Sequence, residues 1–189
     1  MRGREILIGV TGGIAAYKAA ALVSRLVQAG AGVSVVMTEA ATRLVGPKTF
    51  EALSGRPVGL DLWEGPGPGP GPGAHPHIEL AQTAEVFCVA PATANVLAKA
   101  ACGLADDLLS TVILSFAGPI LFAPAMNCDM WTKPAVQRNV QRLRDDGYLL
   151  IDPEEGFLSC RAVGPGRMAE PETIAAAIAK ALQSVPQRP

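Results

Sequence analysis

The sequence predicts an α/β fold built on a single doubly wound parallel sheet, and three observations support this prediction. Short, wholly apolar runs recur along the chain, as expected for strands that are buried on both faces of a parallel sheet. Longer segments with helical periodicity separate these runs. The first unit of strand, glycine turn, helix and second strand is already complete by Met37, which is typical of the start of such a fold.

The order of elements follows from the same signals. Strands are expected at Ile6–Val10, Val33–Met37, Val86–Ala90, Ile120–Ala123 and Tyr148–Ile151. Helices are expected at Ile14–Ala29, Thr93–Ala101, Asp106–Phe116, from Pro134 onward, and at Glu172–Gln183. Gly30 ends the first helix, and Pro91 and Pro124 end two of the strands. The sequence therefore predicts one Rossmann-like or flavodoxin-like domain over residues 1–189, with five or six parallel strands.

The composition of the chain argues against several classes of protein. The chain has 189 residues, 49% of them apolar, and a formal charge of −1, so no overall charge favours nucleic acid or an anionic membrane. The four cysteines include no C-x-x-C pair, and no apolar stretch approaches 18 residues. We expect a soluble, cytoplasmic protein without a metal site. The alternating Gly-Pro stretch at 65–73 is expected to form an exposed flexible loop, with a lid as the alternative.

The first turn, Gly12-Gly13, lies between a strand and a helix N-terminus. Unpaired N–H groups and the helix dipole make such a turn suitable for an anion, and small residues allow a phosphate to come close. The spacing is neither G-x-G-x-x-G nor a Walker A loop. Thr38 follows the second strand, where a dinucleotide fold would have an acidic residue for the ribose. The pattern favours a mononucleotide, and a tight turn without a ligand is the alternative.

Two later loops follow neighbouring strands and are expected to converge on one crevice at the carboxyl edge of the sheet. Pro91-Ala92-Thr93-Ala94-Asn95 offers small residues against a planar ring, although Thr93 is also a plain N-cap candidate. Pro124-Ala125-Met126-Asn127 occupies the corresponding place after the next strand. Asn127 is the stronger candidate there, because a buried amide needs partners.

Titratable candidates are few. His75 and His77 are the only histidines, so an imidazole base must be one of them, and no further residues complete a metal site around them. Cys88 and Cys102 are expected to be buried small apolar residues. Cys160 lies in a glycine-rich loop and is expected to be exposed and reactive.

Four motifs stand in a fixed order along almost the whole chain. They are Thr11-Gly12-Gly13-Ile14-Ala15-Ala16-Tyr17-Lys18, His77-Ile78-Glu79-Leu80, Pro91-Ala92-Thr93-Ala94-Asn95 and Pro124-Ala125-Met126-Asn127-Cys128-Asp129-Met130-Trp131. This order resembles the flavin-containing cysteine decarboxylases, and most closely the phosphopantothenoylcysteine decarboxylases of coenzyme A biosynthesis. The histidine motif alone is weak, whereas its combination with the Pro-Ala-Met-Asn stretch is highly specific.

The resemblance implies FMN as cofactor and a homo-oligomer built from trimers, as a trimer or a dodecamer, with each flavin near a subunit interface. It implies conversion of phosphopantothenoylcysteine to phosphopantetheine through oxidation to a thioaldehyde, loss of CO₂ and re-reduction. By motif, the FMN-binding residues are Gly12, Gly13, Ile14, Thr38, Thr93, Ala94, Asn95, Val96 and Ala125. His77 is implied as the base, Asn127 with Met126 as the substrate-binding pair, and Cys160, in a substrate flap around 156–168, as a late acid.

Two departures from the family pattern bear on these roles. Relatives usually have glycine where this chain has Arg161, which matters if that glycine adopts a positive φ. Val96 replaces a threonine and removes one hydroxyl from the flavin loop. Alternative functions are a peptidyl-cysteine decarboxylase, a flavin prenyltransferase-like protein and, ranked last, a non-catalytic flavin-binding regulatory subunit.

Overall fold

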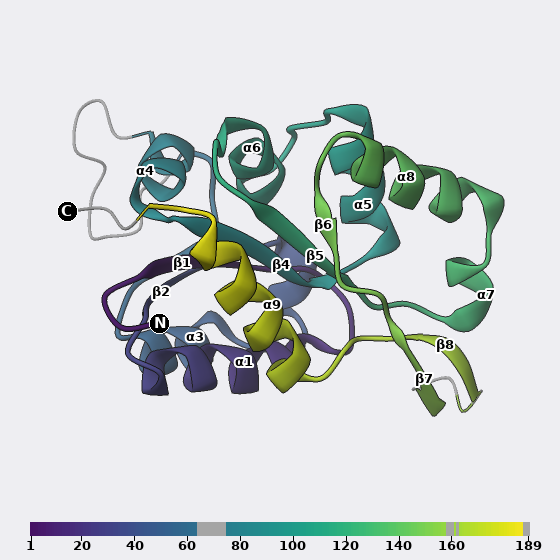
Figure 1. Ribbon diagram of the computed structural model, residues 1–189, viewed down its shortest axis with the longest axis horizontal. Coiled ribbons are helices and arrows are strands. Elements are labelled where there is room, and N and C mark those ends of the chain that lie inside the picture. The colour runs from purple at the N-terminus through teal and green to yellow at the C-terminus, as the bar shows by residue number, and fades with distance from the viewer. Residues whose placement is uncertain (64–74, 158–160, 162, 187–189) are drawn as a thin grey trace.

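The main sheet has six parallel strands in the order β3-β2-β1-β4-β5-β6, which confirms the doubly wound fold (Figure 1). The computed structural model describes residues 1–63, 75–157, 161 and 163–186. The strands are β1 (Glu5–Val10), β2 (Gly32–Met37), β3 (Val58–Gly59), β4 (Val86–Ala92), β5 (Ile120–Pro124) and β6 (Leu149–Leu150). The chain reverses its direction of winding between β1 and β4, which are hydrogen-bonded neighbours. Ligand sites of open α/β sheets lie above such a switch point.

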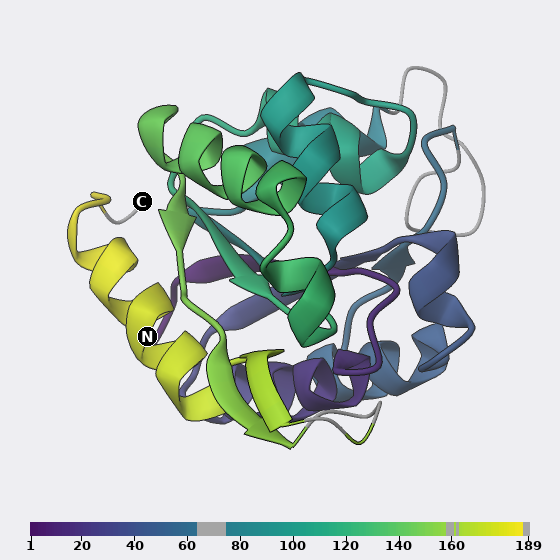
Figure 2. The ribbon, with the colours of Figure 1, turned by 90° about the vertical axis from the view of Figure 1, so that its right-hand side faces the viewer.

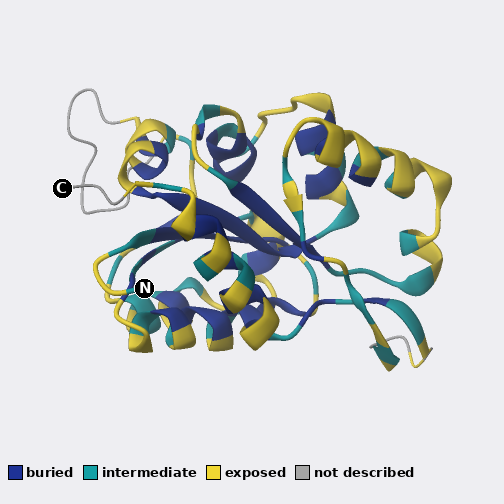
Figure 3. Cartoon of the chain, viewed as in Figure 1, coloured by how far each residue is buried: buried dark blue, intermediate teal, exposed yellow. Residues whose placement is uncertain are grey.

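Helices cover both faces of this sheet and build two apolar cores. One face carries α1 (Ala16–Gln28), α2 (Glu39–Thr42), α3 (Pro47–Ser54) and α9 (Pro171–Gln183). The other carries α4 (Pro76–Thr83), α5 (Ala94–Cys102), α6 (Leu108–Ser115) and α8 (Pro134–Asp145). Successive side chains of β1 alternate between the cores, since Ile6 and Ile8 belong to the first and Leu7 to the second. Every residue of β4 and β5 is buried (Figure 3).

A two-stranded antiparallel hairpin extends from the carboxyl edge of the sheet. It consists of β7 (Glu154–Phe157) and β8 (Val163–Arg167), and the short helix α7 (Cys128–Trp131) packs beside it (Figure 2). Among the described residues of the stretch 156–168, Gly156, Phe157 and Val163–Arg167 belong to these two strands, whereas the sequence predicted a loop there. Pro165 is tolerated in β8 because a two-stranded hairpin consists only of edge strands, so one missing N–H leaves no buried partner.

Other differences from the sequence-based expectation are local. The elements α2, α3, β3, α4 and α7 were not expected, and the last expected strand shortens to β6. Arg161 adopts a φ of +67°, so the left-handed backbone expected of a glycine is kept with an arginine in its place. The Gly-Pro stretch at 65–73 and Cys160 lie outside the described residues. Across the part of the chain that the structure describes, no helix is both long and apolar enough to cross a membrane.

Candidate active site

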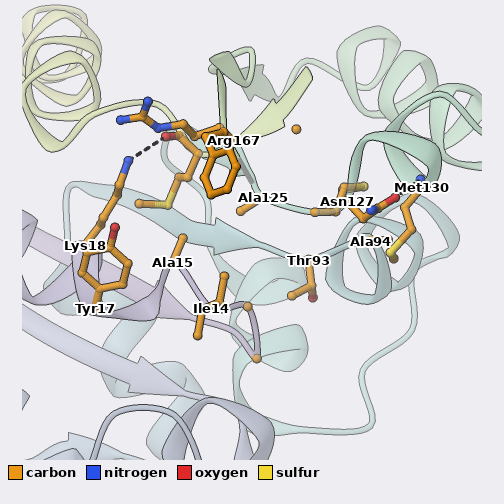
Figure 4. Close-up of a pocket in the computed structure, with 16 residues that line it drawn as sticks. Ile14, Ala15, Tyr17, Lys18, Thr93, Ala94, Ala125, Asn127, Met130 and Arg167 are labelled. Carbon is orange, nitrogen blue, oxygen red and sulfur yellow. Dashed lines mark hydrogen bonds between the residues drawn. The ribbon is translucent and has the colours of Figure 1, made fainter. Parts of the chain in front are cut away.

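A cavity of about 490 Å³ opens at the carboxyl edge of the sheet, above the neighbouring strands β1, β4 and β5 (Figure 4). Four segments that are distant in sequence form its wall: the turn into α1, the loop from β4 to α5, the loop from β5 to α7, and the hairpin. Its lining residues include Gly12, Gly13, Ile14, Ala15, Tyr17, Lys18, Thr93, Ala94, Ala125, Met126, Asn127, Met130, Phe157, Gly166, Arg167 and Met168. The convergence of the first three segments agrees with the arrangement expected from the sequence.

The glycine turn brings backbone close to the cavity. A Cβ added at Gly12 would lie 2.5 Å from the Cβ of Ala40, so no side chain fits there. A Cβ at Gly13 would meet only ordinary contacts at 3.5 Å from Pro91 and Thr93. Helix α1 begins directly after the turn and has no side-chain cap at Ala15, so its first amide groups give this end of the cavity a partial positive charge.

Thr11 connects this turn to the next loop, a role that was not predicted from the sequence. Its hydroxyl donates to the carbonyl oxygen of Pro91 at 2.7 Å, and the backbone N–H of Thr93 donates to it at 3.1 Å. Only 1% of Thr11 is exposed. A threonine directly before two glycines at a strand end was the available signal. One buried hydroxyl thus fixes the positions of the two loops relative to each other.

The β4–α5 loop contributes to the cavity with only some of its expected residues. Thr93 caps α5 by accepting from the N–H of Val96 at 3.4 Å, and Thr93 and Ala94 both line the cavity. Asn95 is exposed and is not among the lining residues, and Val96 is buried in the second core. Thr38 caps α2 by accepting from the N–H of Ala41 and is likewise not among the lining residues.

Asn127 caps α7 and lines the cavity at the same time. Its side-chain oxygen accepts from the N–H of Asp129 at 2.7 Å and of Met130 at 3.4 Å. The side-chain oxygen therefore serves as the helix cap, and any hydrogen bond that this side chain donates comes from its NH₂. The preceding residue, Met126, donates its N–H to the carbonyl oxygen of Gly166 at 2.9 Å, which fixes β8 to this loop.

His77 does not line the cavity of its own chain. It lies in the first turn of α4, which packs against α6, and its backbone oxygen accepts from Ser115. Helix α4 and the hairpin lie at opposite sides of the molecule in Figure 1. Its Nδ1 atom is buried and has no hydrogen-bond partner among the described residues. The neighbouring His75 is exposed, with ring centroids 5.9 Å apart.

Cys88 and Cys102 differ in their exposure to solvent. Cys88 is fully buried in β4, and this burial raises the pKa of its thiol to about 12, so it is inert at neutral pH. The prediction that Cys102 is buried was wrong, because it is the last residue of α5 and is exposed.

The charged residues on the cavity wall are both basic. Among the lining residues that the structure describes, Lys18 and Arg167 carry charge and no carboxylate does. Behind them, Glu170 forms ion pairs with both. The hydrogen bond from Lys18, with the charge of Arg167, holds the pKa of Glu170 below its usual value. No role for these three residues was predicted from the sequence.

The fold and the cavity define a flavodoxin-like α/β protein with a basic, glycine-lined site at the carboxyl edge of its sheet. The chain belongs to the Flavoprotein family, whose model matches residues 1–183. It is 49% identical over 174 residues to the coenzyme A biosynthesis bifunctional protein CoaBC of Bacillus subtilis, covering 92% of this chain and 42% of that protein. It is 47% identical to CoaBC of Vibrio cholerae, covering 93% and 43%. The chain thus spans less than half the length of these curated relatives.

Matches to solved structures agree with these sequence relatives. A PPC decarboxylase mutant complexed with pantothenoylaminoethenethiol matches with a TM-score of 0.86 and 31% identity, covering 97% of this chain and 100% of that one. The FMN-dependent cysteine decarboxylase SpaF matches with a TM-score of 0.79 and 37% identity, covering 95% and 97%. These matches confirm the resemblance found from the four motifs.

Proposed function

We propose that this chain binds FMN and decarboxylates phosphopantothenoylcysteine to phosphopantetheine in coenzyme A biosynthesis. The observation that carries the proposal is the single cavity shared by Gly12-Gly13, Thr93-Ala94 and Met126-Asn127. Relatives that are CoaBC proteins and neighbours that are PPC and FMN-dependent cysteine decarboxylases support both the reaction and the cofactor.

The residues present fit a flavin mononucleotide. The N-terminal ends of α1 and α5 carry the partial positive charge that suits a phosphate, and the small residues Gly12, Gly13 and Ala94 line the cavity beside them. Ala125 and Ile14 provide small and apolar surface for a ring system. We propose Thr38, Asn95 and Val96 as further binding residues, although none of them lines the cavity. Bound FMN supplies a reversible two-electron acceptor.

The substrate's carboxylate is assigned to Asn127. The NH₂ of that side chain can donate a hydrogen bond to a carboxylate oxygen while its oxygen stays engaged at the cap of α7. Met126 gives apolar contact beside it. Asn127 therefore holds the group that leaves as CO₂ in a fixed orientation without adding negative charge.

Proton transfer is assigned to His77 and Cys160. An imidazole exchanges protons near neutral pH, so His77 serves as base during oxidation and decarboxylation of the substrate. Cys160 provides the proton that completes re-reduction of the enethiol, a role for which a thiol is far more acidic than a serine hydroxyl.

We further propose a homo-oligomer built from trimers, with the site near a subunit interface. The position of His77 away from the cavity supports this, because a second copy can bring its own α4 to the site. The exposed apolar side chains of Ile14 and Tyr17 at the cavity, 61% and 63% exposed, also support a covered surface there.

Mass spectrometry of the reaction products tests the function directly. The purified holoprotein is incubated with phosphopantothenoylcysteine and, separately, with a peptide ending in cysteine. We expect a yellow protein that releases FMN on denaturation and forms phosphopantetheine from the first substrate. Decarboxylation of the peptide alone would establish the alternative peptidyl-cysteine activity, and turnover of neither would leave a flavin-binding protein.

A further inference from the structure

Lys18, Arg167 and Glu170 form a charged cluster at one end of the cavity. Lys18 lies in α1 and is 9% exposed, and its ammonium donates to Glu170 at 3.0 Å and to the carbonyl oxygen of Met168 at 3.4 Å. Arg167, the last residue of β8, forms an ion pair with the same carboxylate oxygen. Figure 4 shows Lys18 on the opposite side of the cavity from Thr93, Ala94 and Asn127.

The cluster leaves one positive charge facing the cavity. A lysine that is nearly buried needs a counter-charge, and Glu170 supplies it. Arg167 then remains as the additional cation, and its guanidinium carries five N–H donors in a planar fork that matches phosphate. Its position is constrained by the hairpin itself, since a Cβ added at Gly156 would lie 3.1 Å from Cδ and Nη1 of Arg167.

The two ends of the cavity therefore have different chemistry. One end holds Asn127 with its NH₂ donor, together with the start of α5 at Thr93 and Ala94. The other holds the Lys18–Arg167 pair, which no role proposed so far uses. A substrate with a carboxylate at one end and a phosphate monoester at the other matches this division.

We propose that Lys18 and Arg167, held in place by Glu170, form the subsite for the phosphate monoester of the substrate. This inference rests on the proposed function. It assigns to Arg167 the preference for a phosphorylated small molecule over the same molecule without its phosphate. Glu170 acts as a positioning residue, because it holds both cations without lining the cavity.

The test compares kcat/KM for phosphopantothenoylcysteine and for pantothenoylcysteine in the holoenzyme. Wild-type protein should prefer the phosphorylated substrate. Arg167→Gln should reduce that preference about 10- to 100-fold, mainly through KM, because one charge-assisted pair of hydrogen bonds is lost. Arg167→Lys should keep part of the preference. Calorimetric binding of phosphopantetheine and pantetheine gives a second measure that does not depend on turnover.

Arg25→Gln is the matched control. Arg25 also projects from α1 and is ion-paired, with Glu172, but it does not line the cavity. It should keep the full preference. Unchanged preference in Arg167→Gln would overturn the inference and leave the proposed function intact. Loss of bound FMN from Arg167→Gln, measured by absorbance, would instead assign the cluster to the cofactor phosphate. A wild-type protein that converts neither substrate would overturn both.

Discussion

The loops at the carboxyl edge of the sheet and the β7–β8 hairpin line the same cavity, but they are held in different ways. In the loops, the hydroxyl of Thr11 is buried between two segments, and the N–H of Ala125 donates to Ala92 in the neighbouring strand. In the hairpin, Phe157 and Val163 are 68% and 76% exposed, and pairing is mainly within the hairpin itself. Loops that are fixed by buried hydrogen bonds suit binding of the cofactor in one position, whereas an exposed hairpin suits selection of the substrate.

The largest expected effect tests whether either region supplies the base. Among the described residues, neither the loops nor the hairpin contributes a histidine to the cavity, and His77 is the proposed base. Because His77 does not line the cavity of its own chain, His77→Asn should keep FMN. Loss of the base should lower the decarboxylation rate about 10²- to 10⁴-fold. Anaerobic stopped-flow and product analysis measure this. His75→Asn, which alters the exposed neighbour, should remain active. Equal loss in both variants would mean that no single histidine is the base.

The second prediction concerns the chemistry assigned to the region between β7 and β8. Cys160→Ser should still release CO₂ but accumulate the enethiol, which has two hydrogens fewer than phosphopantetheine, because serine is a far weaker acid. Mass spectrometry distinguishes the two compounds. A normal yield of phosphopantetheine would remove Cys160 from the mechanism.

The third prediction tests the rigidity of the loops. Gly12→Ala would place a Cβ 2.5 Å from that of Ala40, so α2 must shift. We expect the free energy of unfolding to fall by about 1–3 kcal/mol, with partial loss of FMN. Urea denaturation with FMN quantification checks both. Gly46→Ala adds the same methyl group into open space at an ordinary φ of −67°, so it should keep FMN fully bound and cost only the small loss of stability expected of alanine at the N-cap of α3.

The fourth prediction tests the hairpin in the same way. Phe157→Ala should change the free energy of unfolding by less than about 0.5 kcal/mol, because the ring is mostly exposed, yet it should raise KM several-fold because the ring lines the cavity. Its cross-strand partner Val163 is exposed but does not line the cavity. Val163→Ala should therefore leave KM unchanged. A large loss of stability in Phe157→Ala would contradict the distinction between the two regions.

The smallest expected effect concerns Arg161, the one non-glycine residue with a positive φ in the described part of the chain. A left-handed conformation costs an L-residue about 1–2 kcal/mol, and glycine recovers this but loses about 0.5–1 kcal/mol of unfolded-state entropy. Arg161→Gly should therefore stabilise the protein by no more than about 1.5 kcal/mol in urea titration. Destabilisation would show that the arginine makes contacts that outweigh its backbone strain.

The sequence predicted the loops of the site better than the hairpin, for a physical reason. Buried strands and their following turns are local signals, so Ile6–Val10, Gly12-Gly13 and the cap at Thr93 could be recognised directly. Strand β8 could not, because Pro165 and its flanking glycines indicate a loop until a partner strand is known. The role of Lys18 was hidden for a similar reason, since its partner Met168 is 150 residues away.

The lengths of the strands have a consequence for how copies of this chain can associate. The outermost strands, β3 and β6, have two residues each, whereas the interior strands have five to seven. A second chain adding to either side would gain too few backbone hydrogen bonds to continue the sheet. Short borders of this kind protect a folding chain from edge-to-edge aggregation, and they direct contacts between copies to the helices and loops.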